Sequence, residues 1–183
     1  MIFEKHSNLN GLHAFLGASQ YAWIRYDDDT LIERYRNHLA TVKGTELHEL
    51  AAHCIKLGVK LQGSNTLAMY VNDAIGYRMN TEQVLYYSPF IFGTADAICF
   101  RDNTLRIHDL KTGATPAKID QLLIYAALFC LEYKYKPYEI DIVLCIYQND
   151  TVYEHKPGVD EIAPIMDTIV HFDKLLQKIN KEG

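Results

Sequence analysis

Two runs rich in β-branched and aromatic residues, separated by a short polar break, place the strongest limit on the fold. Residues 91–100 (IFGTADAICF) and 104–110 (TLRIHDL) have the composition of strands, and the second run alternates apolar and polar side chains. Asp102-Asn103 lies between them and is typical of a tight turn. The pattern predicts a β-hairpin or meander, and therefore a sheet at the centre of the fold.

Helical patterns surround this hairpin. Apolar residues recur at helical spacing over 29–60, 66–79, 117–133 and about 159–181, and further strands are expected at 84–88, 139–148 and 151–156. In the first helical stretch Gly44-Thr45 separates two apolar stripes, which makes Thr45 a candidate N-cap. This order predicts an α/β fold, a mixed central β-sheet flanked by helices.

The length and composition favour one soluble domain. A chain of 183 residues suits a single domain over 1–183, with a mainly helical part at 1–80 and a sheet core with flanking helices at 81–183. No apolar run approaches the roughly 18 to 20 residues of a membrane span, and the first residues lack the layout of a signal peptide. We therefore expect a cytoplasmic protein with no membrane partner.

Charge and cysteine usage exclude some functions. The net charge of -5 does not indicate a nucleic-acid binder by bulk electrostatics, although a local basic groove remains compatible with it. The four cysteines are scattered, have apolar neighbours and form no CxxC pair. We expect them to be reduced core residues, and we expect no iron–sulfur cluster.

The second strand of the hairpin carries a candidate site. Asp109 and Lys111 are two residues apart, so their side chains project from the same face, while Leu110 points the other way into the core. If the turn folds the strands together, Asp96 approaches the same face. Two carboxylates with nearby backbone carbonyls suit Mg²⁺ or Mn²⁺. The alternative is a solvated strand face with Asp96 capping a turn.

Four motifs in order resemble the RecB-like branch of the PD-(D/E)XK nuclease superfamily, whose members are common in bacteriophages. They are GTELH at 44–48, GTAD at 93–96, DLKTG at 109–113 and QLLIY at 121–125. DxK alone is a weak signal, whereas the ordered set is specific. Ala95 stands at the position that gives the superfamily's motif its proline. Many members lack this proline, so the difference leaves the assignment of the motif intact. The chain lacks the cysteine cluster of the iron–sulfur relatives and any helicase segment. The resemblance therefore implies a stand-alone nuclease domain.

The resemblance also implies roles for the residues of the first three motifs. Asp96 and Asp109 would hold one or two Mg²⁺ or Mn²⁺ ions, with the Leu110 carbonyl as a further ligand. His48 would complete the coordination through a neutral imidazole nitrogen. Lys111 would orient the attacking water and offset charge at the scissile phosphate. Taken alone, His48 would be read as a helix-surface or capping histidine.

The fourth motif supplies Gln121 and Tyr125, which lie on one helix face because they are four residues apart. The resemblance implies that they contact the nucleic-acid backbone or Lys111. The alternative places Tyr125 in the core and Gln121 at a helix start.

The function expected from these residues is a metal-dependent deoxyribonuclease, an exonuclease of the kind used in phage recombination or DNA processing. DNA would be its partner, with a recombinase or single-strand-binding protein as a further one, and a homo-oligomer is left open. If the chain is phage-encoded, it would act in the host cytoplasm. The alternatives are a nucleic-acid-binding or assembly protein that keeps the nuclease fold without cutting, and a metal-dependent hydrolase acting on another substrate.

Overall fold

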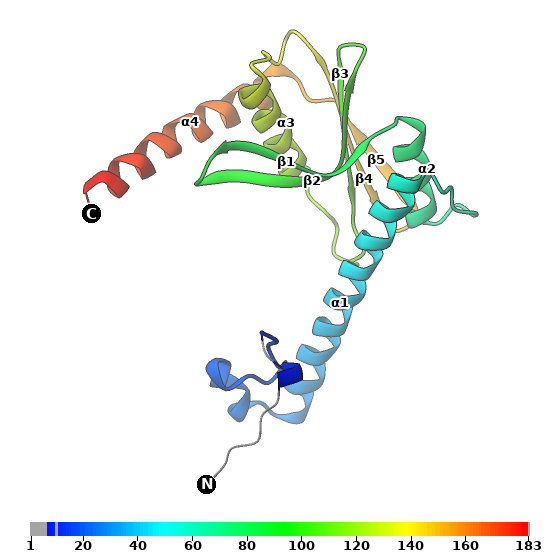
Figure 1. Ribbon diagram of the computed structural model, residues 1–183, viewed down its shortest axis with the longest axis vertical. Coiled ribbons are helices and arrows are strands. Elements are labelled where there is room, and N and C mark those ends of the chain that lie inside the picture. The colour runs from blue at the N-terminus through cyan, green and yellow to red at the C-terminus, as the bar shows by residue number, and fades with distance from the viewer. Residues whose placement is uncertain (1–6, 10, 183) are drawn as a thin grey trace. The chain divides into compact units, whose positions relative to one another are not determined.

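A five-stranded mixed sheet forms the centre of the larger part of the chain (Figure 1). The computed structural model describes residues 7–9 and 11–182, and the chain divides into two compact units, Met1–Thr45 and Glu46–Gly183. The strands lie in chain order: β1 (Asn80–Ser88), β2 (Ile91–Arg101), β3 (Thr104–Leu110), β4 (Asp141–Gln148) and β5 (Thr151–His155). Only the β3–β4 pair is parallel. The predicted mixed sheet is confirmed.

The predicted turns lie where the sequence places them. Asp102 and Asn103 join β2 to β3 with φ values of 48° and 59°, and Asn149 and Asp150 join β4 to β5 with 51° and 54°. Positive φ at both central residues is the hairpin geometry that Asn and Asp tolerate best among residues with a side chain. The β2–β3 pairing runs from Arg101↔Thr104 to Ala97↔His108.

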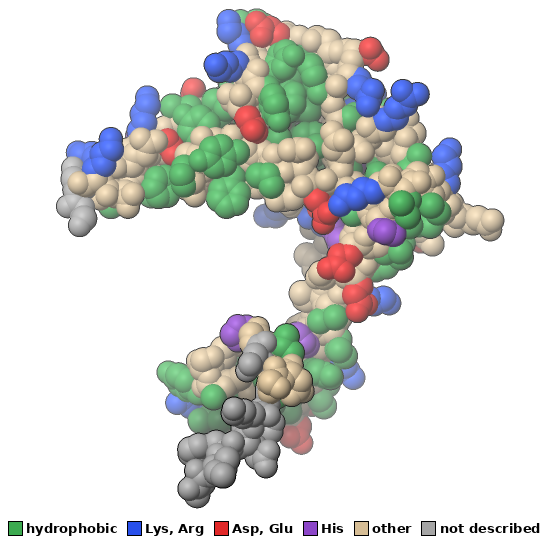
Figure 2. All heavy atoms as spheres, viewed as in Figure 1, with side chains coloured by type: hydrophobic (Ala, Val, Ile, Leu, Met, Phe, Trp, Pro, Cys, Tyr) green, Lys and Arg blue, Asp and Glu red, His purple; other side chains and the backbone are tan. Residues whose placement is uncertain are grey.

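The β1–β2 pair has one covered face and one exposed face. Leu85 is fully buried in the cluster that α3 (Asp120–Tyr133) contributes to. Tyr86 and Phe92, paired across the two strands, are exposed and stack with ring centroids 6.5 Å apart. Hydrophobic side chains gather over this hairpin in Figure 2. Alternation along β1 thus separates core from surface.

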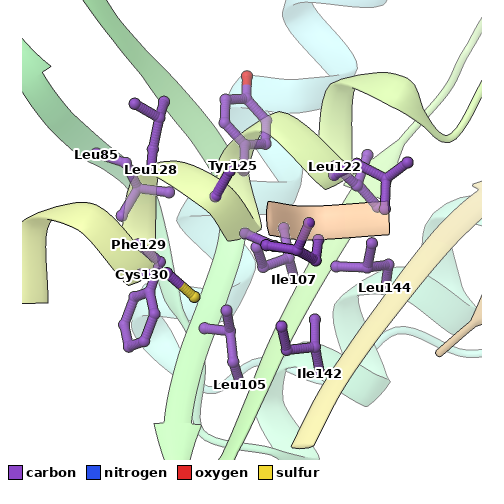
Figure 3. Packing of buried hydrophobic residues seen from close by; sticks show 14 of the residues in the cluster. Leu85, Leu105, Ile107, Leu122, Tyr125, Leu128, Phe129, Cys130, Ile142 and Leu144 are labelled. Atoms are coloured by element: carbon purple, nitrogen blue, oxygen red, sulfur yellow. The ribbon is translucent and has the colours of Figure 1, made fainter. Parts of the chain in front are cut away.

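Helices cover both faces of the sheet. One core cluster, shown in Figure 3, joins α3 and α4 (Val159–Glu182) to residues such as Leu105, Ile107 and Leu144. The second joins α2 (Thr66–Gly76) and Ala51, Cys54 and Ile55 of α1 (Asp28–Leu57) to the other face. The four cysteines are buried and free, as predicted.

The predicted N-cap at Thr45 is wrong. Gly44 and Thr45 lie inside α1, and the Thr45 hydroxyl donates to the Thr41 carbonyl at 3.2 Å, which is a contact made within a helix. Glycine in a helix interior costs only about 1 kcal/mol, so it need not end the helix.

The predicted helix at 117–133 begins three residues later, at Asp120. Gln148, at the end of β4, bonds to the backbone just before this helix. Its side-chain oxygen accepts from the Ala117 N–H at 3.0 Å, and its side-chain nitrogen donates to the carbonyls of Gly113 (2.6 Å) and Thr115 (2.8 Å). These bonds engage the backbone of 113–117 before the helix starts.

The first unit contains two short 3₁₀ segments, Ser7–Leu9 and Ala18–Arg25, and the start of α1. Asp27 caps α1 by accepting from the Thr30 N–H at 2.8 Å. Phe15 meets Tyr35 edge-on at 5.1 Å. Among the residues that the structure describes, no helix is long and apolar enough to cross a membrane.

Candidate active site

Asp96 and Asp109 come together where β2 and β3 stop pairing. The last paired residues are Ala97 and His108, and the two aspartates follow directly on the outer side of that pair. The Leu110 N–H donates to Asp96 Oδ2 at 3.0 Å. Beyond the last backbone pair, this side-chain hydrogen bond holds Asp96 against the end of β3, beside Asp109.

Asp109 is the most constrained member of the site. Its side chain is buried, with the residue only 2% exposed. The Lys111 ammonium donates to Oδ1 at 3.1 Å and lies 3.0 Å from Oδ2. Within the described residues, Oδ2 has no hydrogen-bond donor of its own. Burial and the charge of Asp96 raise the pKa of Asp109 to about 6, although the hydrogen bond from Lys111 works in the opposite direction.

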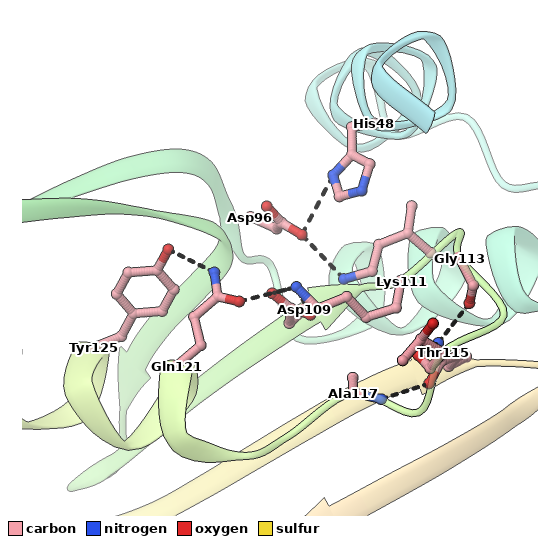
Figure 4. Close-up of polar contacts among 11 residues, drawn as sticks. His48, Asp96, Asp109, Lys111, Gly113, Thr115, Ala117, Gln121 and Tyr125 are labelled. Atoms are coloured by element: carbon pink, nitrogen blue, oxygen red, sulfur yellow. Dashed lines mark hydrogen bonds and ion pairs between the residues drawn. The ribbon is translucent and has the colours of Figure 1, made fainter. Parts of the chain in front are cut away.

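Lys111 links the carboxylates to α3. Its backbone N–H donates to the Tyr147 carbonyl at 2.9 Å, which holds the start of the following loop against β4. Its ammonium also donates to Gln121 Oε1 at 2.9 Å. The Gln121 amide in turn donates to the Tyr125 hydroxyl at 2.9 Å (Figure 4). Because an ammonium can only donate, this chain fixes which end of the Gln121 amide faces Lys111.

The glycine of GTAD makes room for Tyr125. A Cβ built on Gly93 would lie 2.8 Å from Tyr125 Cε1, so a side chain at this position would displace the ring. Tyr125 is 9% exposed and belongs to the first core cluster. Tyr125 is therefore a core residue, the alternative considered for it, and its hydroxyl contacts the Gln121 amide.

His48 reaches the site from α1. Its Nδ1 lies 3.4 Å from Asp96 Oδ2, and its side chain is 37% exposed. The hydrogen bond to Asp96 raises the pKa of His48, because the carboxylate favours the protonated imidazole. A metal ion would need the neutral imidazole. His48 is thus a close partner of Asp96 here and, as the neutral imidazole, a candidate ligand.

His108, on β3, lies away from the candidate active site. His108 Nδ1 is 3.2 Å from the Tyr147 hydroxyl, which donates to Asp73 at 2.8 Å. Burial lowers the pKa of His108 to about 3, so it stays neutral. Leu110 packs in the second core cluster, as strand alternation predicts.

A pocket of about 460 Å³ adjoins Lys111 and Gln121. Its lining comes from Lys111, the 113–118 loop, Asp120, Gln121 and Gln148. Sequence reasoning missed Gln148, which fastens this loop. The only local signal was a polar residue at the end of an otherwise apolar strand, DIVLCIYQ.

The donors suited to a cation are His48, Asp96 and Asp109, an imidazole and two carboxylates. Among the described residues there is no group of three or more His, Cys, Asp or Glu arranged to hold a metal ion. The raised pKa of Asp109, which comes from burial and from the charge of Asp96, fits a site that gains from positive charge in addition to the Lys111 ammonium, which lies 3.0 Å from Oδ2.

Sequence comparison finds no match to a protein-family model and none to a curated protein.

Proposed function

We propose that this chain is a Mg²⁺- or Mn²⁺-dependent deoxyribonuclease built on a PD-(D/E)XK core. One observation carries the proposal. Asp96 and Asp109 adjoin where β2 and β3 stop pairing, and Lys111 binds both Asp109 and Gln121. The fold thus places two carboxylates beside the Lys111 ammonium, and the Gln121 side-chain amide orients that ammonium. This combination suits hydrolysis of a phosphodiester.

Asp96, Asp109, His48 and the backbone carbonyl of Leu110 would hold one or two ions. When bound, such an ion supplies a Lewis acid that polarises the phosphate and lowers the pKa of a water. The site residues fit this role because Asp96 lies 3.4 Å from His48 and is tied to the end of β3 beside the buried Asp109. Binding would also offset the burial of the Asp109 carboxylate and its repulsion by Asp96, which together raise the pKa of Asp109.

The residues beyond the carboxylates have positioning roles. Lys111 carries the positive charge that would lie beside a non-bridging phosphate oxygen as negative charge develops there. Gln121 holds the Lys111 ammonium at 2.9 Å, and Tyr125 holds the Gln121 amide. Gly93 lets Tyr125 reach that position. Residues of three motifs are therefore linked by contacts. These run from Gly93 on β2, through Tyr125 and Gln121 on α3, to the Lys111 ammonium.

We further propose an exonuclease acting in phage recombination or DNA processing, as a single nuclease domain. DNA would be its partner, together with a recombinase or single-strand-binding protein. The support for an exonuclease with these partners is the ordered set of four motifs. This chain has the charged residues that the motifs require. The competing function is a DNA-binding protein of the same fold that does not cut.

Digestion of end-labelled DNA tests the proposal. Linear and closed circular substrates, single- and double-stranded, are incubated with Mg²⁺, Mn²⁺ or EDTA. Lys111→Ala is compared with Lys60→Ala, which removes an exposed lysine outside the site. We expect metal-dependent loss of linear DNA that disappears only in Lys111→Ala, with circles spared. Intact DNA in every lane, together with retention of DNA in a mobility-shift assay, would instead support the non-cutting protein.

A further inference from the structure

A second pocket lies near the turn that joins β2 to β3, away from Asp96 and Asp109. It measures about 450 Å³, within the roughly 300–1,000 Å³ of small-molecule sites. Its lining consists of Gly76, Tyr77, Arg78, Cys99, Arg101, Asp102, Thr104 and Arg106. Residues 46–183 contain three arginines and ten lysines, and all three arginines line this pocket.

The pocket and the candidate active site lie on opposite faces of β3. Arg106 and Asp109 are three residues apart in the strand, which is about 10 Å along it, and strand alternation turns their side chains in opposite directions. His108, on the same side as Arg106, packs edge-on against Tyr77 with ring centroids 5.7 Å apart. Occupancy of one site therefore leaves the other open.

Among the residues that the structure describes, the three guanidinium groups have no carboxylate partner. Arg106 lies over the Tyr77 ring, 4.3 Å from its centroid. Arg101 Nη2 makes a long contact of 3.4 Å with the Arg78 carbonyl. In the described part of the chain, none of the three has an ion pair, since the pairs there involve His48, Lys56, Lys111, His155 and Lys156. Asp102, the single acidic residue of the lining, is not paired with any of them.

We propose that this pocket binds phosphoryl groups. Arginine presents a planar fork of donors that matches phosphate oxygens, and Arg106 is already held in place by the Tyr77 ring. Three unpaired guanidinium groups around one hollow favour a ligand with more than one negative charge. Such phosphoryl groups occur in free pyrophosphate and nucleotides and in a nucleic-acid backbone. The proposal does not depend on DNA cleavage at the other site.

Binding is measured in EDTA with two probes, inorganic pyrophosphate by calorimetry and a short fluorescent single-stranded oligonucleotide by anisotropy. The pocket variants are the double substitution Arg78→Gln/Arg101→Gln, which alters exposed side chains, and Arg106→Lys, which keeps the charge but loses the fork. Arg36→Gln in the first unit is the matched control, and Lys111→Ala reports any binding at the candidate active site.

We expect at least about a tenfold loss of pyrophosphate affinity in both pocket variants, with Arg36→Gln and Lys111→Ala near wild type. An oligonucleotide that displaces pyrophosphate would identify a nucleic-acid backbone as the ligand. Pyrophosphate binding without oligonucleotide binding would identify a free anion or nucleotide. The proposal is overturned if wild type binds neither probe, or if the pocket variants bind both as tightly as wild type does.

Discussion

Replacing Asp109 with asparagine should stabilise the metal-free protein. The carboxyl group is buried beside Asp96, and its pKa rises from an ordinary 3.8 to about 6. At roughly 1.4 kcal/mol per pKa unit, this rise corresponds to about 3 kcal/mol of lost stability when the group is ionised. The figure already includes the attraction of Lys111, because that contact lowers the same pKa. The isosteric amide removes the charge and keeps the volume.

The direction of the pH dependence follows from the higher pKa in the folded state. Below the unfolded value near 3.8 the group is protonated in both states and does not affect stability. Between about pH 3.8 and pH 6 the unfolded state has released this proton while the folded state keeps it, so stability falls as pH rises and levels off above about pH 6. Asp109→Asn should therefore match wild type at about pH 4 and exceed it by about 3 kcal/mol at about pH 8.

Urea unfolding in EDTA at both pH values measures this difference. For a chain of this size, the gain at high pH corresponds to roughly 6 to 12 °C in Tm. Asp141→Asn is the matched control, because it removes an exposed carboxylate at the start of β4. Addition of Mg²⁺ should stabilise wild type but not Asp109→Asn, because only wild type retains the carboxylate ligand.

Two results would refute the reasoning. If Asp109→Asn is less stable than wild type at high pH, the ion pair with Lys111 outweighs the burial of the carboxylate. If the gain is the same at both pH values, it does not come from ionisation of Asp109. A third result separates the two ideas. If the extra stability of Asp109→Asn depends on pH but Mg²⁺ does not stabilise wild type, the cost of ionising Asp109 is supported and the metal site is not.

Three further predictions concern packing, hydrogen bonding and metal binding. Gly93→Ala should destabilise the protein by about 1–3 kcal/mol in thermal unfolding, because the new methyl group displaces the Tyr125 ring. Tyr147→Phe removes the hydroxyl that donates to Asp73, and should lower the urea-derived stability by about 1–2 kcal/mol. Calorimetric Mn²⁺ affinity should fall about tenfold between about pH 7 and pH 5, since Asp109 takes up a proton near pH 6.

Local signals predicted most of the fold. Asp102-Asn103 and Asn149-Asp150 marked their turns, because few other residues tolerate positive φ at two successive positions. The anchoring of the loop before α3 depends on a residue that no local pattern identifies. Gln148 comes from β4, more than thirty residues further along the chain, and its hydrogen bonds to 113–117 exist only once the sheet has formed.

In the candidate site, too, local patterns predict some features, and others depend on how the elements pack. Strand alternation predicts that Asp109 and Lys111 share a face, and helical spacing predicts the same for Gln121 and Tyr125. The bond from Lys111 to Gln121 connects these two pairs, and it depends on where α3 lies against β3. The steric reason for Gly93 is likewise tertiary.

The register of the β2–β3 hairpin governs both sites. Pairing of Ala97 with His108 places Asp96 next to Asp109, and the same alignment pairs Cys99 with Arg106 in the lining of the arginine pocket. A slip of one residue would turn one strand's side chains to the opposite face. Asp109 would then leave Asp96, and Arg106 would leave Tyr77. The turn at Asp102-Asn103 therefore acts on both sites, although it contributes no residue to the candidate active site and only Asp102 to the lining of the arginine pocket.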